Sequence, residues 1–193
     1  MKRSITANEL SGRATGALIF SGFGALWFLI ALYAREIISV ANVSAVFVGF
    51  AILLAGACAL MREAKRWPRM PAAPGIWKTF AWVNVLQGLA IFVATSILIW
   101  RHMSIYNLSV IAFVVGLHFL PLARLFRYNP HYVTGSALVV WALVSAWLAP
   151  VEHLQSTTAL GTGAILWLSA VAAIVLAFLA ARRSVIGVAP DAV

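Results

Sequence analysis

Residues 105–125 read IYNLSVIAFVVGLHFLPLARL, an apolar stretch in which only Arg124, near the end, is charged. A helix needs about 20 predominantly apolar residues to cross the hydrocarbon core of a bilayer. The stretch has that length, and it shows no sustained alternation of apolar and polar residues. It is therefore typical of a transmembrane helix and not of a membrane barrel strand.

Five further stretches have the same character, so the sequence predicts one all-α domain, a bundle of six transmembrane helices. The expected spans are residues 14–34, 37–61, 77–100, 105–125, 132–150 and 158–181. The composition agrees, because 63% of the 193 residues are hydrophobic and 10% are charged. A soluble domain of this length needs more polar surface than such a composition supplies.

Basic residues are distributed unevenly between the spans. Most of the 14 lysines and arginines flank alternate loops and the two ends of the chain: Lys2, Arg3, Arg13, Arg62, Lys65, Arg66, Arg69, Lys78, Arg124, Arg127, Arg182 and Arg183. The other loops hold only Arg35 and Arg101. The positive-inside rule therefore predicts cytoplasmic N- and C-termini. With its alanine and arginine content, this pattern predicts a multi-pass protein of a bacterial inner membrane.

The net charge of +9 would indicate a nucleic-acid partner in a soluble protein. Here the basic residues flank helix ends, which favours the lipid bilayer and its anionic headgroups as partners, and no nucleic acid. The contact is expected in the cytoplasmic loop 62–76, at Arg62, Lys65, Arg66 and Arg69. Three prolines disfavour a regular helix in this loop: Pro68, Pro71 and Pro74. An acidic partner protein is the alternative.

Catalytic and metal-binding patterns are lacking in the sequence. All five acidic residues lie at span boundaries or outside the spans, which leaves buried-carboxylate chemistry without its residue. The four histidines have no metal-ligand spacing, and no nucleophile motif, phosphate loop or dinucleotide pattern occurs. We therefore expect no catalytic residue, no metal and no cofactor.

Three polar residues are expected deep in the membrane and at one level. Asn84 and Gln87 lie six and nine residues after Lys78, and His118 lies six residues before Arg124. At about 1.5 Å per residue, this places all three roughly 9–14 Å from the cytoplasmic charges. The spacing of Asn84 and Gln87 lets them share a helix face. These three side chains predict a polar cavity centred on His118.

Two residues complete the predicted binding site, and a third shapes it. Ser21 falls at about the same level in the first span, and Arg124 lies where the fourth span meets the interface. Pro121 removes a backbone donor and its ring clashes with the carbonyl of Leu117. We therefore expect the helix to kink at Pro121.

Two functions fit these patterns. The polar cluster predicts a transporter or channel for a small solute or ion, with His118 lining the path. The same groups also serve as ordinary interhelical hydrogen bonds, each worth about 0.6 kcal/mol. The alternative is an accessory membrane protein that self-associates or binds a partner complex through helix contacts. An enzyme acting on lipid is the weakest hypothesis, since no nucleophile or carboxylate pair is present.

Overall fold

The structure, a computed structural model, describes residues 6–69 and 75–186. Lys2, Arg3, Pro71, Pro74 and Asp191 lie outside this part of the chain. Within it, the long helices are α1 (Ala7–Ala34), α2 (Val40–Ala64), α3 (Ile76–Trp100), α4 (Asn107–Phe126), α5 (Pro130–Leu148) and α6 (Leu154–Ile186). Two short 3-10 helices, η1 (Ser104–Tyr106) and η2 (Val151–His153), precede α4 and α6.

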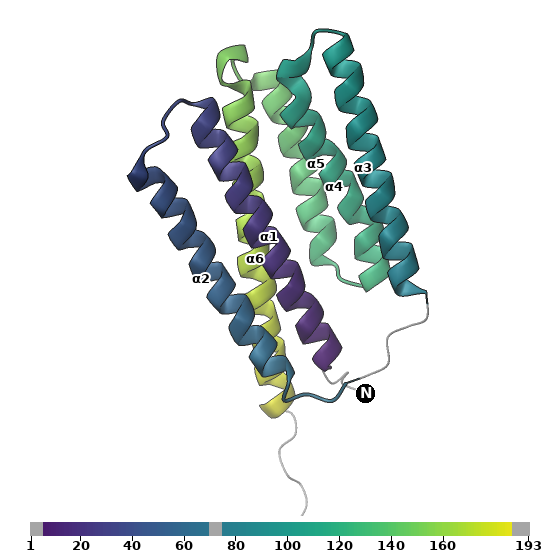
Figure 1. Cartoon of the computed structure of the whole chain (residues 1–193). Coiled ribbons are helices and arrows are strands. Elements are labelled where there is room, and N and C mark those ends of the chain that lie inside the picture. Colours follow the sequence, from purple (N-terminus) through teal and green to yellow (C-terminus); the bar gives the residue numbers. More distant parts are fainter. Residues whose placement is uncertain (1–5, 70–74, 187–193) are drawn as a thin grey trace, which may run out of the picture.

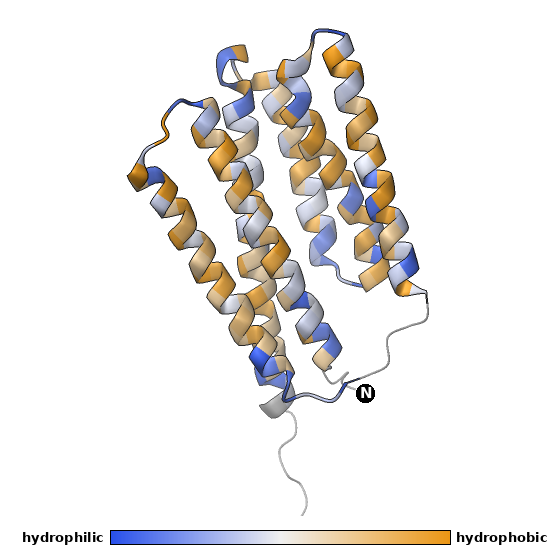
Figure 2. Cartoon of the chain, viewed as in Figure 1, coloured by the Kyte–Doolittle hydropathy of each residue, from blue (hydrophilic) through white to orange (hydrophobic). Residues whose placement is uncertain are grey.

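All six long helices are apolar and long enough to cross a membrane. This confirms the predicted all-α, multi-pass architecture. Hydrophobic residues predominate along the helices (Figure 2), and many large apolar side chains are exposed on the outside of the bundle, such as Trp147 and Leu148 at 87% and 77%. Such a surface is stable against lipid tails and not against water. The chain is therefore embedded in a bilayer.

The helices form an elongated bundle with α2 at one edge and α3 at the other (Figure 1). Helix α1 packs against α6 and α2, α5 packs between α6 and α4, and α3 packs mainly against α4. Helix α3, which is described throughout, has no buried residue. Helix α1 begins and α6 ends at the same end of the bundle (Figure 1), which we call the terminal end. The turn between α4 and α5 lies at this end too.

Helix α1 begins at Ala7, before the apolar stretch expected from residue 14. A capping box explains the early start, because the Thr6 hydroxyl accepts from the Glu9 backbone N–H at 3.3 Å. The Glu9 carboxylate in turn accepts from the Thr6 N–H at 3.4 Å. The Ala7 N–H donates to the Pro68 carbonyl at 3.0 Å. The start of α1 is thereby joined to the loop that follows α2.

Two tryptophans cover three glycines of neighbouring helices. The Trp167 indole of α6 leaves no room for a Cβ at Gly24 of α1 or at Gly49 of α2, and its N–H donates to the Ser21 carbonyl at 3.0 Å. The Trp141 indole of α5 covers Gly161 of α6 in the same way. Its N–H donates to the Thr158 carbonyl at 3.2 Å. Each accepting carbonyl lies three residues before a covered glycine of the same helix: Ser21 before Gly24, and Thr158 before Gly161. Small residues thus set the spacing of these helices.

Helices α4 and α5 touch backbone to backbone at two glycines. A Cβ on Gly116 would lie 2.8 Å from the Gly135 carbonyl oxygen, and a Cβ on Gly135 would lie 2.7 Å from that of Gly116. Gly116 lies two residues before His118, and Gly135 lies four residues, or about one helical turn, after His131. The close crossing therefore brings the two histidine-bearing segments together.

Candidate functional site

Asn84 and Gln87 of α3 differ in exposure. Gln87 is half-buried, as are Phe80 and Val83, which lie on the same helix face. Because α3 packs mainly against α4, this is the face that meets α4. Asn84 is exposed, and its side-chain amide donates to the Phe80 carbonyl at 2.7 Å. Gln87 therefore lies at the interface with α4, whereas Asn84 is exposed and its side chain is bonded to its own helix.

His118 is half-buried between α3 and α4. Its ring lies near the backbone of Val83, one turn from Gln87. Its Nδ1 atom is buried and has no hydrogen-bond partner within the described residues.

A second histidine, His131 at the start of α5, lies close enough to His118 for the two rings to interact electrostatically. Its ring centroid lies 5.6 Å from that of Phe119 and 5.9 Å from that of Phe20. Its Nδ1 atom is also buried without a partner in the part of the chain that the structure describes. The site thus contains two imidazoles, and sequence reasoning identified only one.

Tyr128 and Arg13 extend this cluster toward the terminal end. The Tyr128 ring centroid lies 4.9 Å from that of His131, and the Arg13 guanidinium lies 5.2 Å from the Tyr128 centroid. The Tyr128 hydroxyl is buried and has no partner among the described residues. Burial raises the pKa of Tyr128, and the nearby Arg13 charge lowers it to a smaller extent. We call His118, His131, Tyr128 and Arg13 the histidine site.

The residues around the histidine site give it a positive character. The sequence from residue 107 to residue 148, which includes α4 and α5, contains no aspartate or glutamate. Glu9 lies one turn before Arg13 and takes part in the capping box. Arg124 and Arg127 lie at the same end and are exposed. The site therefore combines cations and potential donors with no acidic group from α4 or α5.

The remaining predicted residues lie around this site without joining it. The Ser21 hydroxyl is buried and donates to the Ala17 carbonyl at 2.6 Å, while its neighbour Phe20 faces His131. Arg124 is exposed in the last turn of α4. Pro121 is exposed too, and α4 continues through it as an α-helix to Phe126. The kink at Pro121 stays a prediction.

A second polar region joins α4, α5 and α6 toward the other end of the bundle. The Thr158 hydroxyl donates to the Ser145 hydroxyl at 2.9 Å and lies 3.0 Å from that of Ser109. Ser145 donates to the Ala142 carbonyl at 3.2 Å, which completes a chain of hydroxyls. Nearer the middle of the helices, the Thr134 and Ser169 hydroxyls lie 2.8 Å apart. We call the first three residues the hydroxyl chain.

Two further buried side-chain oxygens are without a partner in the described part of the chain. They are Oγ1 of Thr162, one turn after Thr158 on α6, and Oδ1 of Asn107, the first residue of α4. Serine and threonine hydroxyls in membrane helices normally bond their own backbone, as Ser21 does. These two oxygens are therefore unusual for buried polar groups.

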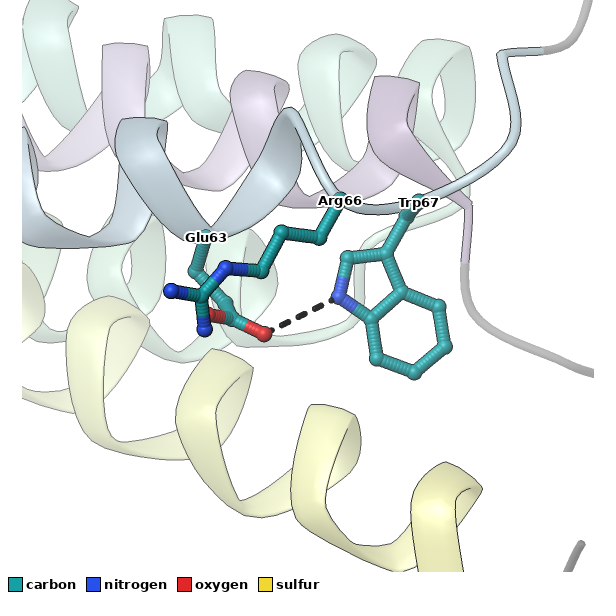
Figure 3. A network of polar contacts seen from close by, with 3 residues as sticks. All are labelled: Glu63, Arg66 and Trp67. Atoms are coloured by element: carbon teal, nitrogen blue, oxygen red, sulfur yellow. Dashed lines mark hydrogen bonds and ion pairs between the residues drawn. The ribbon is translucent and has the colours of Figure 1, made fainter.

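The basic side chains in the last turn of α2 and in the loop after it are exposed, as contact with headgroups requires: Arg62, Lys65, Arg66 and Arg69. Arg66 pairs with Glu63 at 3.0 Å, and the Trp67 indole N–H donates to the same carboxylate at 3.3 Å (Figure 3). This local pairing holds the start of the loop against the end of α2. Binding of anionic lipid stays a prediction.

Comparison of the chain with protein families, curated proteins and solved structures found no match. The fold defines a multi-pass, all-helical membrane protein. Its function is therefore argued from its own residues.

Proposed function

We propose that this membrane protein passes a small polar solute or ion along α4 and its neighbours, with the histidine site at the terminal end of the path. One observation carries the proposal. The buried side-chain atoms without partners follow this route: Asn107 Oδ1, Thr162 Oγ1, His118 Nδ1, His131 Nδ1 and Tyr128 OH. A buried polar group without a hydrogen bond is costly, most of all in a membrane. Water or a polar solute in the path would satisfy these atoms.

The length of the route supports passage across the whole bilayer. Asn107 is the first residue of α4, and Tyr128 follows its end. The 20 residues of α4 extend about 30 Å, which matches the hydrocarbon thickness of a typical bilayer. Between the two ends, the paired hydroxyls of Thr134 and Ser169 are a further polar point.

The terminal end faces the cytoplasm in this proposal, and the membrane is the cell inner membrane. The positive-inside rule supports that orientation, because the exposed arginines and lysines of the loop after α2 lie at this end. The same side chains then meet anionic headgroups.

Cysteine accessibility tests the path. In a Cys58→Ser background, Thr162→Cys is compared with Leu168→Cys on the same helix, where Leu168 is 68% exposed to lipid. We expect a charged, membrane-impermeant thiol reagent to modify the cysteine at position 162 in proteoliposomes and to leave that at position 168 unmodified. Equal and negligible modification of both would refute an aqueous path.

A second candidate function is that of an accessory protein, and the exposure of Asn84 favours it. An amide facing lipid is costly, and membrane helices use asparagine to bind one another. Helix α3 buries none of its residues within this chain, so its outer face is open to a partner helix. A co-purifying membrane protein that Asn84→Leu releases, while Leu86→Ala retains it, would support this function over transport.

A further inference from the structure

We propose that Trp141 and Thr162 form a hydrogen-bond switch, in which the indole N–H and the hydroxyl alternate as donors to the carbonyl of Thr158. In the structure the indole N–H donates to this carbonyl at 3.2 Å. When the hydroxyl replaces it, the indole is free to move away from Gly161, which it covers. The exchange itself is independent of transport, whereas its role as a lid over the hydroxyl chain rests on the proposed function.

The hydroxyl of Thr162 lacks the hydrogen bond that its position in a helix offers. The residue is 0% exposed, and its Oγ1 atom has no partner among the described residues. Serine and threonine hydroxyls in helices commonly donate to the carbonyl four residues earlier. Six other hydroxyls of the described helices make that bond: those of Ser21, Thr79, Thr95, Thr134, Ser169 and Ser184. For Thr162 the corresponding carbonyl belongs to Thr158.

The indole of Trp141 explains the missing bond. A backbone carbonyl oxygen has two lone pairs. One lone pair of the Thr158 carbonyl accepts the backbone N–H four residues later in the helix, and the indole N–H occupies the other. The Thr162 hydroxyl is therefore left without an acceptor on this carbonyl. Two donors compete for one lone pair, and the structure shows the state in which the indole holds it.

Trp167 provides an internal comparison. Its indole N–H also donates to a carbonyl three residues before a covered glycine, that of Ser21, at 3.0 Å. The residue four positions after this acceptor is Ala25, which has no hydroxyl. Trp167 therefore has no competing donor at that position, and we expect its indole to stay in place. Trp141 differs because a threonine occupies the equivalent position.

The place of the switch in α6 makes the second state affordable. Thr158 lies four residues after Leu154, the first residue of α6, and therefore about 6 Å from that end of the helix. Trp141 is half-buried, so part of its ring already lies at the surface of the bundle. A released indole N–H at this depth can reach the headgroup level, where tryptophan is favoured. Neither donor is then left buried without a partner.

The hydroxyl chain shares a residue with the switch. The carbonyl of Thr158 accepts from the indole, and the hydroxyl of Thr158 joins Ser109 and Ser145. All three residues of the chain are buried. Displacement of the indole uncovers Gly161, which has no side chain to take its place. In the proposed path, Trp141 is thus a lid whose opening gives water or a polar solute access to Thr158.

The test follows the indole N–H groups by NMR in the full chain, prepared with isotope-labelled tryptophan in nanodiscs. We expect the Trp141 indole to exchange with deuterated solvent faster than that of Trp167. Thr162→Val keeps the shape of the side chain and removes the competing hydroxyl. It should slow the exchange at Trp141 about two- to tenfold, the worth of one net hydrogen bond, and leave Trp167 unchanged. Thr162→Ser retains the donor and should exchange as the wild type does.

Gly161→Ala drives the switch in the other direction, because a Cβ at this position leaves no room for the indole. The Trp141 indole should then exchange faster than in the wild type. Gly88→Ala is the matched control, since a Cβ there meets nothing within 4 Å. Equal exchange at Trp141 in the wild type and in Thr162→Val would overturn the proposal. If Gly161→Ala does not fold, the comparison of Thr162→Val with Thr162→Ser still decides.

A cysteine arm separates the lid from the path. In the Cys58→Ser background, Ser109→Cys reports whether an impermeant thiol reagent reaches the hydroxyl chain. A lid predicts that adding Thr162→Val slows this modification by the same factor as the indole exchange. If only the indole exchange responds, the switch is retained and its role as a lid is wrong. If position 109 is never modified, the path fails, and the indole exchange still decides the switch.

Discussion

Gly116 of α4 and Gly135 of α5 face each other so closely that a Cβ atom on either glycine would clash with the backbone of the other. An alanine at position 116 would put its Cβ 2.8 Å from the Gly135 carbonyl oxygen. Backbone atoms of two packed helices cannot move aside easily, so we expect Gly116→Ala to lower the free energy of unfolding by about 1–3 kcal/mol. Thermal unfolding in detergent measures this loss.

Gly88 of α3 is the control for that prediction. A Cβ at Gly88 would meet no atom within 4 Å. Gly88→Ala should therefore leave the stability unchanged or raise it by up to about 1 kcal/mol, as the helix propensity of alanine predicts. Equal losses in the two variants would contradict a close α4–α5 crossing.

Trp167→Phe should destabilise the protein by about 1 kcal/mol, because the Ser21 carbonyl loses the indole N–H and the space beside Gly49 is no longer filled. Trp147→Phe provides the comparison, since that side chain is 87% exposed and should change the stability little. Chemical or thermal unfolding of both variants in one detergent compares them. A loss at Trp147 as large as that at Trp167 would argue against the interhelical role of Trp167.

The hydroxyl chain should show coupling between α4 and α6. Thr158→Val keeps the shape of the side chain but removes the oxygen that bonds Ser109 and Ser145. In a double-mutant cycle of Thr158→Val with Ser109→Ala, we expect a coupling energy of about 0.6 kcal/mol, the average for membrane helices. The cycle of Thr158→Val with Ser184→Ala, far along α6, should give no coupling.

Tyr128 should make the protein less stable in strong alkali. Its pKa is raised by burial above the ordinary value of 10.0, so the folded chain holds the phenol proton more tightly than the unfolded chain. The unfolded state therefore loses this proton first, and stability falls as the pH rises from 10.0 toward the folded pKa. Tyr128→Phe should remove this part of the fall in an unfolding series against pH.

The charge of Arg13 opposes the effect of burial on the pKa of Tyr128. Its charge lowers the pKa of Tyr128, so Arg13→Gln should raise that pKa further. The tyrosinate absorbance of the Tyr128→Phe variant is subtracted from that of the protein with Tyr128, and the difference at each pH is the titration of Tyr128. An unchanged midpoint in Arg13→Gln would show that the guanidinium does not lie over the ring in solution.

Hydropathy was sufficient to predict the number and course of the membrane helices, because the bilayer imposes the same length and apolar character on each of them. It did not predict that α1 begins at Ala7. That start depends on hydrogen bonds between Thr6 and Glu9, which hydropathy does not register.

The candidate site was only partly predictable. The i, i+3 spacing placed Asn84 and Gln87 on neighbouring positions of one helix, but the direction in which α4 packs decides that Gln87 meets it and Asn84 does not. His131 was not among the residues that the sequence predicted for the site. Its approach to His118 depends on the crossing at Gly116 and Gly135, a contact between helices that no single-helix pattern contains.

The position of the Trp167 indole also has a consequence for biosynthesis. Its slot is formed by glycines of α1 and α2, and 146 residues separate Ser21 from the tryptophan that binds it. The first helical hairpin therefore leaves the translocon with this slot unfilled and waits in the lipid while the intervening helices are made.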